Sequence, residues 1–115
     1  MEFKDHPVDA SLAGWNDLCT CLENACASSS GKLTYKRTAD SELLVQETSP
    51  PRSLRLEYSP DFRKVRYNAG ISGWQEVSVA KPPQKPVVFE TLYHQRYTVE
   101  EFCNFLLEQL DKSPF

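Results

Sequence analysis

The sequence predicts an α+β fold: a two-layer sandwich with an N-terminal helix, an antiparallel meander of about five to six strands, and a C-terminal helix, both helices on one sheet face. Three observations favour it. Apolar residues recur at helical spacing over residues 9–29, they alternate with polar residues over 53–58 and 64–69, and a helix-initiating motif begins at Thr98. Short connections between consecutive strands favour an antiparallel meander.

Length and composition fit one globular domain. The chain has 115 residues, so we treat residues 1–115 as a single α+β domain, with 1–8 expected to be frayed and 113–115 a tail. Aromatic residues make up 11% of the chain, which argues against disorder. The net charge of −3 excludes a protein that depends on general attraction to nucleic acid.

The first expected helix covers residues 9–29. Asp9 or Ser11 suits its N-cap, and Gly31 suits the left-handed position after its end. Its apolar stripe repeats at spacings of three and four residues: Trp15, Leu18, Cys19, Leu22 and Cys26.

Six segments between the helices are expected to be strands. In 53–58 the apolar side chains point one way, and Arg55 and Glu57 point the other. In 64–69, Lys64 and Arg66 are the outward residues, so the two segments should form a hairpin. The six expected strands are 32–38, 42–47, 53–58, 64–69, 74–80 and 87–93.

The second expected helix has the strongest local signature. Thr98 and Glu101 form a capping box, and Tyr97 can pack on Phe102 as a hydrophobic staple. The apolar face that follows comprises Val99, Phe102, Cys103, Leu106 and Leu110.

The first residues of the chain and its hydropathy predict the cellular location of the protein. Residues 1–7 lack the basic and apolar regions of a secretory signal, and no apolar run approaches the roughly 18–20 residues of a membrane span. We therefore expect a soluble, cytoplasmic protein that is not associated with a membrane.

Four cysteines raise the question of a metal or redox site. Cys19 and Cys21 project about 200° apart on a helix, so they cannot bind one ion together. Cys19, Cys26 and Cys103 fall on apolar faces and are expected in the core. Cys21 lies off that face and is expected to be an exposed thiol, with any redox role left open. The sequence therefore predicts no metal site and no cofactor.

Basic residues concentrate in the middle of the chain. Residues 32–66 hold eight basic and five acidic side chains, although the whole chain is acidic. Strand alternation places Arg55, Lys64 and Arg66 together on the face opposite the core. This basic strip could bind an acidic protein, a phosphate or a nucleic-acid backbone, of which the acidic total disfavours nucleic acid. The alternative is a solvated face that limits aggregation.

The loop before the second helix carries a second group of candidate binding residues, Tyr93, His94 and Arg96. His94 could act as a general base, but the sequence places no nucleophile or acid beside it. An ordinary loop histidine is the alternative. Because no dinucleotide, phosphate-loop, zincin or nucleophile-elbow motif is present either, we predict no catalytic residue.

The element order helix–meander–helix is similar to that of the frataxin family and, more loosely, of small secretion chaperones. A frataxin-like iron role would require a dense acidic ridge on the first helix. That helix offers only Asp9, Asp17 and Glu23, so no site residue is carried over.

The sequence leads to a first hypothesis of a non-enzymatic binding or adaptor domain that uses the exposed sheet face and its flanking loops. An acidic protein is one expected partner and a second copy of the chain is another. The alternative is a ligand-binding protein or enzyme with a pocket between sheet and helices near His94. A metal or redox module is the third hypothesis.

Overall fold

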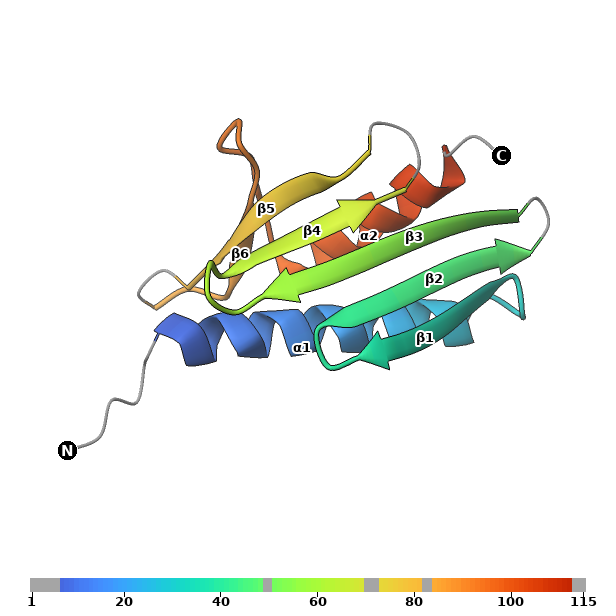
Figure 1. Ribbon diagram of the computed structural model, residues 1–115, viewed down its shortest axis with the longest axis horizontal. Helices are drawn as coiled ribbons and strands as arrows, with labels where there is room; N and C mark the ends of the chain where they lie inside the picture. The colour runs from blue at the N-terminus through green and yellow to red at the C-terminus, as the bar shows by residue number, and fades with distance from the viewer. Residues whose placement is uncertain (1–6, 49–50, 70–72, 82–83, 113–115) are drawn as a thin grey trace.

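The computed structural model describes residues 7–48, 51–69, 73–81 and 84–112. In chain order the elements are α1 (Pro7–Ala27), β1 (Leu33–Ala39), β2 (Glu42–Thr48), β3 (Pro51–Ser59), β4 (Lys64–Asn68), β5 (Gln75–Ala80), β6 (Val88–Glu90), β7 (Arg96–Tyr97) and α2 (Val99–Asp111). The strands form one antiparallel sheet in chain order, and both helices lie on one of its faces (Figure 1). The predicted α+β sandwich is confirmed, with seven strands instead of five to six.

Helix α1 begins slightly earlier than the sequence indicates. It starts at Pro7, because proline is well suited to the first turn of a helix, where its missing N–H would have no partner. Pro7 and Val8 therefore belong to the helix, although we expected them to be frayed. The rest of the expected frayed segment and the 113–115 tail lie outside the described residues. Gly31 takes the predicted left-handed conformation, with φ of 86°.

The faces of the sheet follow the predicted alternation. On β3 the side chains of Leu54, Leu56 and Tyr58 are buried against the helices, and Arg55 is exposed on the other face. The β3–β4 hairpin forms as expected, with Leu56 opposite Tyr67. We call the helix-covered face the inner face and the opposite one the outer face.

The chain between β6 and α2 differs from the prediction. The expected strand 87–93 is interrupted because residues 91–95 form a turn, in which the Thr91 N–H donates to the Gln95 carbonyl and His94 has φ of 64°. The side-chain oxygen of Thr91 also accepts from the N–H groups of Tyr93 and Gln95. The chain then returns as β7, a strand of only two residues.

Helix α2 confirms its sequence signature. The Thr98 hydroxyl accepts from the Glu101 N–H at 3.2 Å, and the Glu101 carboxylate accepts from the Thr98 N–H at 3.0 Å. Phe102 is fully buried and stacks on Phe89 at a ring-centroid distance of 4.8 Å. It also contacts Tyr97, as a hydrophobic staple requires. These contacts join α2 to the short strands at one edge of the sheet.

The N-terminal helix is anchored by Trp15. Its ring stacks on Tyr58 at 5.6 Å, and its indole N–H donates to the Asp40 carbonyl at 2.9 Å. Ser11, one turn earlier, shares a buried hydrogen bond with the Tyr58 hydroxyl. Because the inner face is filled in this way, binding surfaces have to be sought elsewhere.

Candidate interaction surface

Among the described residues, no helix or strand covers the outer face of the sheet (Figure 1). Its central strands carry short polar and charged side chains, and Leu44 is its half-buried apolar residue on β2. Within the described residues, the side chains that the strand register brings to this face include Lys36, Leu44, Gln46, Ser53, Arg55, Glu57, Lys64, Arg66, Asn68, Glu76 and Ser78. This face is the candidate interaction surface.

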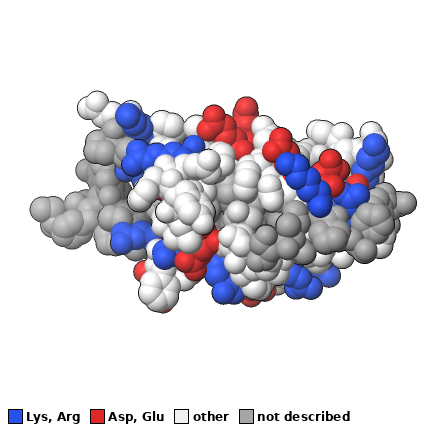
Figure 2. All heavy atoms as spheres, turned by 90° about the horizontal axis from the view of Figure 1, so that it is seen from above, with Lys and Arg blue, Asp and Glu red and all other residues white. Residues whose placement is uncertain are grey.

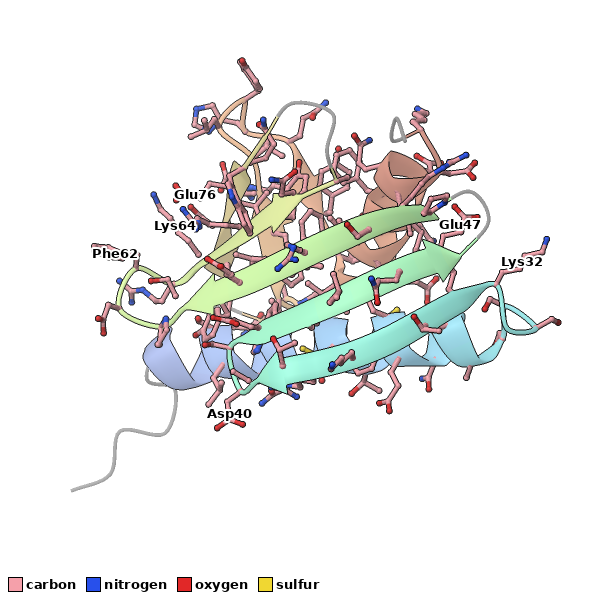
Figure 3. All side chains as sticks on the ribbon, turned by 45° about the vertical axis from the view of Figure 1, so that its right-hand side comes forward. Lys32, Asp40, Glu47, Phe62, Lys64 and Glu76 are labelled. Atoms are coloured by element: carbon pink, nitrogen blue, oxygen red, sulfur yellow. The ribbon has the colours of Figure 1, made fainter. Side chains whose placement is uncertain are left out.

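The three residues of the predicted basic strip all lie on the outer face. Two of them form ion pairs there, and the third forms none within the described residues. Arg66 binds Glu57 at 2.7 Å, and Lys64 binds Glu76 at 3.2 Å. Figure 3 shows Lys64 and Glu76 next to each other. Arg55 instead stands opposite Leu44 and Asn68 and is in no recorded ion pair within the described part of the chain.

The register explains why two of the three cations are neutralised. Glu57 is directly opposite Arg66, and Glu76 is opposite Arg66 on its other side. Arg66 and Arg55 are therefore diagonal rather than directly paired. Acidic side chains next to basic ones leave little net field on this face. Figure 2, which shows the molecule from above rather than onto this face, has both signs intermixed as well. Exposed ion pairs of this kind contribute little stability.

An open groove of about 610 Å³ crosses the outer face at its β3–β4 end. The groove holds Lys64 and Arg66 with their acidic partners, and Phe62 projects from the β3–β4 turn with 73% of its surface exposed (Figure 3). Nearby, the Arg66 guanidinium lies 4.6 Å from the centre of the Trp74 ring. The groove is lined by Ser41, Glu42, Glu57, Tyr58, Ser59, Pro60, Phe62, Lys64, Arg66 and Glu76.

The second group of predicted residues surrounds Glu90. His94 Nδ1 lies 3.0 Å from one carboxylate oxygen of Glu90, and Arg96 Nε lies 3.7 Å from the other. Tyr93 is exposed at the tip of the turn. The register connects this group to the basic strip, because Ser78 lies between Lys64 and Glu90.

His94 lies in solvent rather than in a pocket. Its side chain is 87% exposed, and it lines neither the outer-face groove nor the second groove described below. Glu90 is the acidic neighbour that the sequence did not identify. Since β6 and β7 have only three and two residues, no strand periodicity pointed to this contact.

The thiols differ from expectation at one position. Cys19, Cys26 and Cys103 are buried as predicted, and burial raises the pKa of each. Cys21 is half-buried instead of exposed, because α2 packs along α1 and brings Cys103 near it. A raised pKa disfavours the thiolate, the form that attacks or binds a metal. Within the described ranges, no cluster of three metal-binding side chains is present.

A second groove, of about 780 Å³, lies at the opposite end of the molecule, between β1 and the end of α2. Glu47 lines it, and Arg52, 3.6 Å from Glu47, donates to the carbonyls of Leu110 and Asp111. Arg52 thus faces inward and stabilises the C-terminus of a helix. The signal in the sequence was its even spacing with Leu54, which placed it on the inner side of β3.

Comparison with known proteins adds no family. No protein-family model, curated protein or solved structure gives a significant match to this chain. The similarity of element order to the frataxins therefore transfers no function. Among the described residues, no helix is both long and apolar enough to cross a bilayer.

Proposed function

We propose that this protein is a non-enzymatic interaction domain that binds a partner protein through the outer face of its sheet and the flanking loops. The observation that carries the proposal is the outer-face groove, in which Phe62 is exposed beside the ion-paired residues Lys64 and Arg66. Exposed aromatic and arginine side chains are typical of the residues that contribute most to protein–protein affinity.

The charges around the groove would contribute more to the choice of partner than to binding affinity. Lys64 and Arg66 are already paired with carboxylates, so a partner gains little by supplying another. Arg55 has no such partner among the described residues and is available to an acidic side chain. An acidic protein surface with an apolar anchor for Phe62 is the partner that fits best. We also propose a cytoplasmic location, because four free cysteines are suited to a reducing compartment.

The alternative of an enzyme or ligand-binding protein near His94 lacks support of this kind. A general base works in a site that positions its substrate, whereas His94 is surrounded by solvent apart from its contacts in the turn. A homodimer through the outer face remains one form of the proposed interaction, with a second copy as the partner.

The proposal is tested by affinity capture with quantitative mass spectrometry, using the wild type, Phe62→Ala and Leu12→Ala. Leu12 is a matched control, because it is a large apolar residue with 45% exposure on α1, on the helix side of the molecule. We expect one protein to be retained by the wild type and by Leu12→Ala and to fall by about tenfold with Phe62→Ala, the effect of about 1.4 kcal/mol. A set of captured proteins that is the same for all three would refute the outer-face proposal.

A further inference from the structure

The sheet has two edges, and they are very different. At one edge, β7 has only two residues and is followed directly by α2. At the other, β1 has seven residues and is the outermost strand of the sheet (Figure 1). A strand edge presents unpaired N–H and C=O groups on which another strand can form. Only β1 is long enough to act as such a template.

Hydrogen bonds at Ser29 reveal which backbone groups of β1 point outward. The Leu33 N–H donates to the Ser29 hydroxyl at 2.9 Å, and that hydroxyl lies 3.5 Å from the Leu33 carbonyl. Leu33 therefore directs its backbone groups away from β2. Since alternate residues of an antiparallel strand point the same way, those of Tyr35 and Arg37 also face the edge. No bond from either to a further element is recorded within the described residues.

The length of the template is limited at both ends. Ser29 occupies the Leu33 groups, and the register shifts between Arg37 and Ala39, which ends regular pairing. Tyr35 and Arg37 remain, with two donors and two acceptors between them. An added strand would thus be held over a short stretch, so its side chains must contribute to recognition.

Charge decides which strand can bind there. Lys32, Lys36 and Arg37 lie on or beside β1, and no acidic residue occurs from Gly31 to Ala39. Within the described ranges none of the three is in an ion pair, although the Arg37 guanidinium donates to the Asn16 side chain at 3.2 Å and to the Asp40 carbonyl at 2.6 Å. A second copy pairing across a two-fold axis would bring these cations against their own equivalents, which is unfavourable. An acidic strand would be attracted instead.

We propose that the free edge of β1 binds an extended acidic segment of a partner protein, which adds an eighth strand to the sheet. Side chains of the segment on the outer-face side meet Lys36 and are acidic. Those on the inner side meet the half-buried Leu33 and Tyr35 and are apolar. Arg37 also lies on the inner side, where its guanidinium donates to Asn16 of α1 and to the Asp40 carbonyl, so the acidic side chains are set mainly by Lys36. This site is separate from the outer-face groove and does not depend on it.

The test uses a labelled synthetic peptide in which Glu alternates with Val, and a second peptide with Lys in place of Glu. Fluorescence anisotropy measures binding, and amide hydrogen exchange by NMR locates it. We expect the Glu peptide to bind about tenfold more tightly than the Lys peptide and to slow exchange at the amides of Tyr35 and Arg37 by about tenfold or more.

A matched pair of variants isolates the backbone. Arg37→Ala and Arg37→Pro both remove the side chain, but only proline removes the outward N–H, a change that edge strands tolerate. We expect Arg37→Pro to bind about tenfold more weakly than Arg37→Ala, the effect of one hydrogen bond. If Arg37→Pro does not fold, the exchange data on the wild type decide alone.

Four results would overturn the proposal. They are equal binding of the two peptides, no binding of the Glu peptide, binding that leaves exchange at Tyr35 and Arg37 unchanged, and equal affinities for two folded Arg37 variants. Sedimentation showing a dimer whose Tyr35 and Arg37 amides are already protected would assign the edge to a second copy instead. Loss of binding by Phe62→Ala alone concerns the outer-face groove and leaves the edge proposal intact.

Discussion

Replacing Arg52 by Met should destabilise the protein more than any other single change of an arginine on β3. The Arg52 side chain is 14% exposed, lies 3.6 Å from Glu47, and donates to the final carbonyls of α2. Methionine retains much of the apolar volume of the arginine stem, so the substitution removes mainly the charge and its hydrogen bonds. What remains is Glu47, only 19% exposed, without its nearest cation.

The size of the effect follows from that burial. Removing one partner of a fully buried ion pair costs about 3–5 kcal/mol, because the other charge stays in a poorly solvated place. Both side chains here keep some contact with water, so we expect the free energy of unfolding to fall by about 2–3 kcal/mol. Adding Glu47→Gln to Arg52→Met removes the stranded charge and should restore about 1 kcal/mol.

Urea unfolding measures these differences, with the slope compared between variants to check that both unfold alike. Arg55→Met is the matched control, because Arg55 is on the same strand but exposed on the outer face. It should change stability by no more than about 0.5 kcal/mol. If Arg52→Met and Arg55→Met were equally stable, the assigned faces of β3 would be wrong. If the double variant were less stable than Arg52→Met, the role of the Glu47 charge would be wrong.

Three further predictions concern the packing of the helices and one half-buried phenol. Thr98→Ala should cost about 1 kcal/mol and Phe102→Ala about 3–5 kcal/mol, an order that denaturation midpoints check and that the reverse ranking would contradict. Gly14→Ala should destabilise, because its Cβ would lie 2.6 Å from Val87 Cγ1 and 3.1 Å from Val79 Cγ1, and overpacking of about 1–3 kcal/mol exceeds the helix-propensity gain of about 1 kcal/mol. In a Val87→Ala background the shorter contact is gone, so the same change should cost less, which thermal unfolding of the four variants measures. Burial, with a smaller effect of the neighbouring Cys19 thiol, raises the pKa of Tyr35 from 10.0 to about 12. The unfolded chain therefore loses this proton first, and the free energy of unfolding falls as pH rises from about 10 to about 12. Tyr35→Phe should remove this part of the alkaline loss of stability, which unfolding measured at a series of pH values checks.

The fold was predictable because its signals are local. The stripe that includes Trp15 and Leu22, the alternation around Arg55, and the capping box at Thr98 each reflect a few neighbouring residues, and the structure has all three. The strand β7 was not predictable in this way. Two residues carry no periodicity, and the preceding turn depends on a Thr91 side chain that bonds the backbone.

The candidate site was less predictable, because it depends on register between strands. Alternation correctly gave the face of Lys64 and Arg66, but it could not show that Glu76 and Glu57 stand close enough to neutralise them. Those pairs follow from hydrogen-bonded pairing across three strands. The spacing of Arg52 with Leu54 indicates the inner side of β3, but its hydrogen bond to the end of α2 joins residues 58 apart in sequence, and local patterns cannot show such a contact.

Binding at the two proposed surfaces should depend differently on salt, because the groove has ion-paired cations and, within the described residues, the β1 edge does not. A partner in the outer-face groove must displace water from Lys64 and Arg66 while these already hold their carboxylates, so its affinity should come from Phe62 and depend weakly on salt. At the β1 edge, Lys32 and Lys36 have no ion-pair partner within the described ranges, and an acidic strand would gain their attraction, whereas the Arg37 guanidinium already donates to Asn16 and to the Asp40 carbonyl. Affinity there should fall as salt screens the charges. The salt dependence of binding therefore separates the two surfaces even before the partner of either has been located on the molecule.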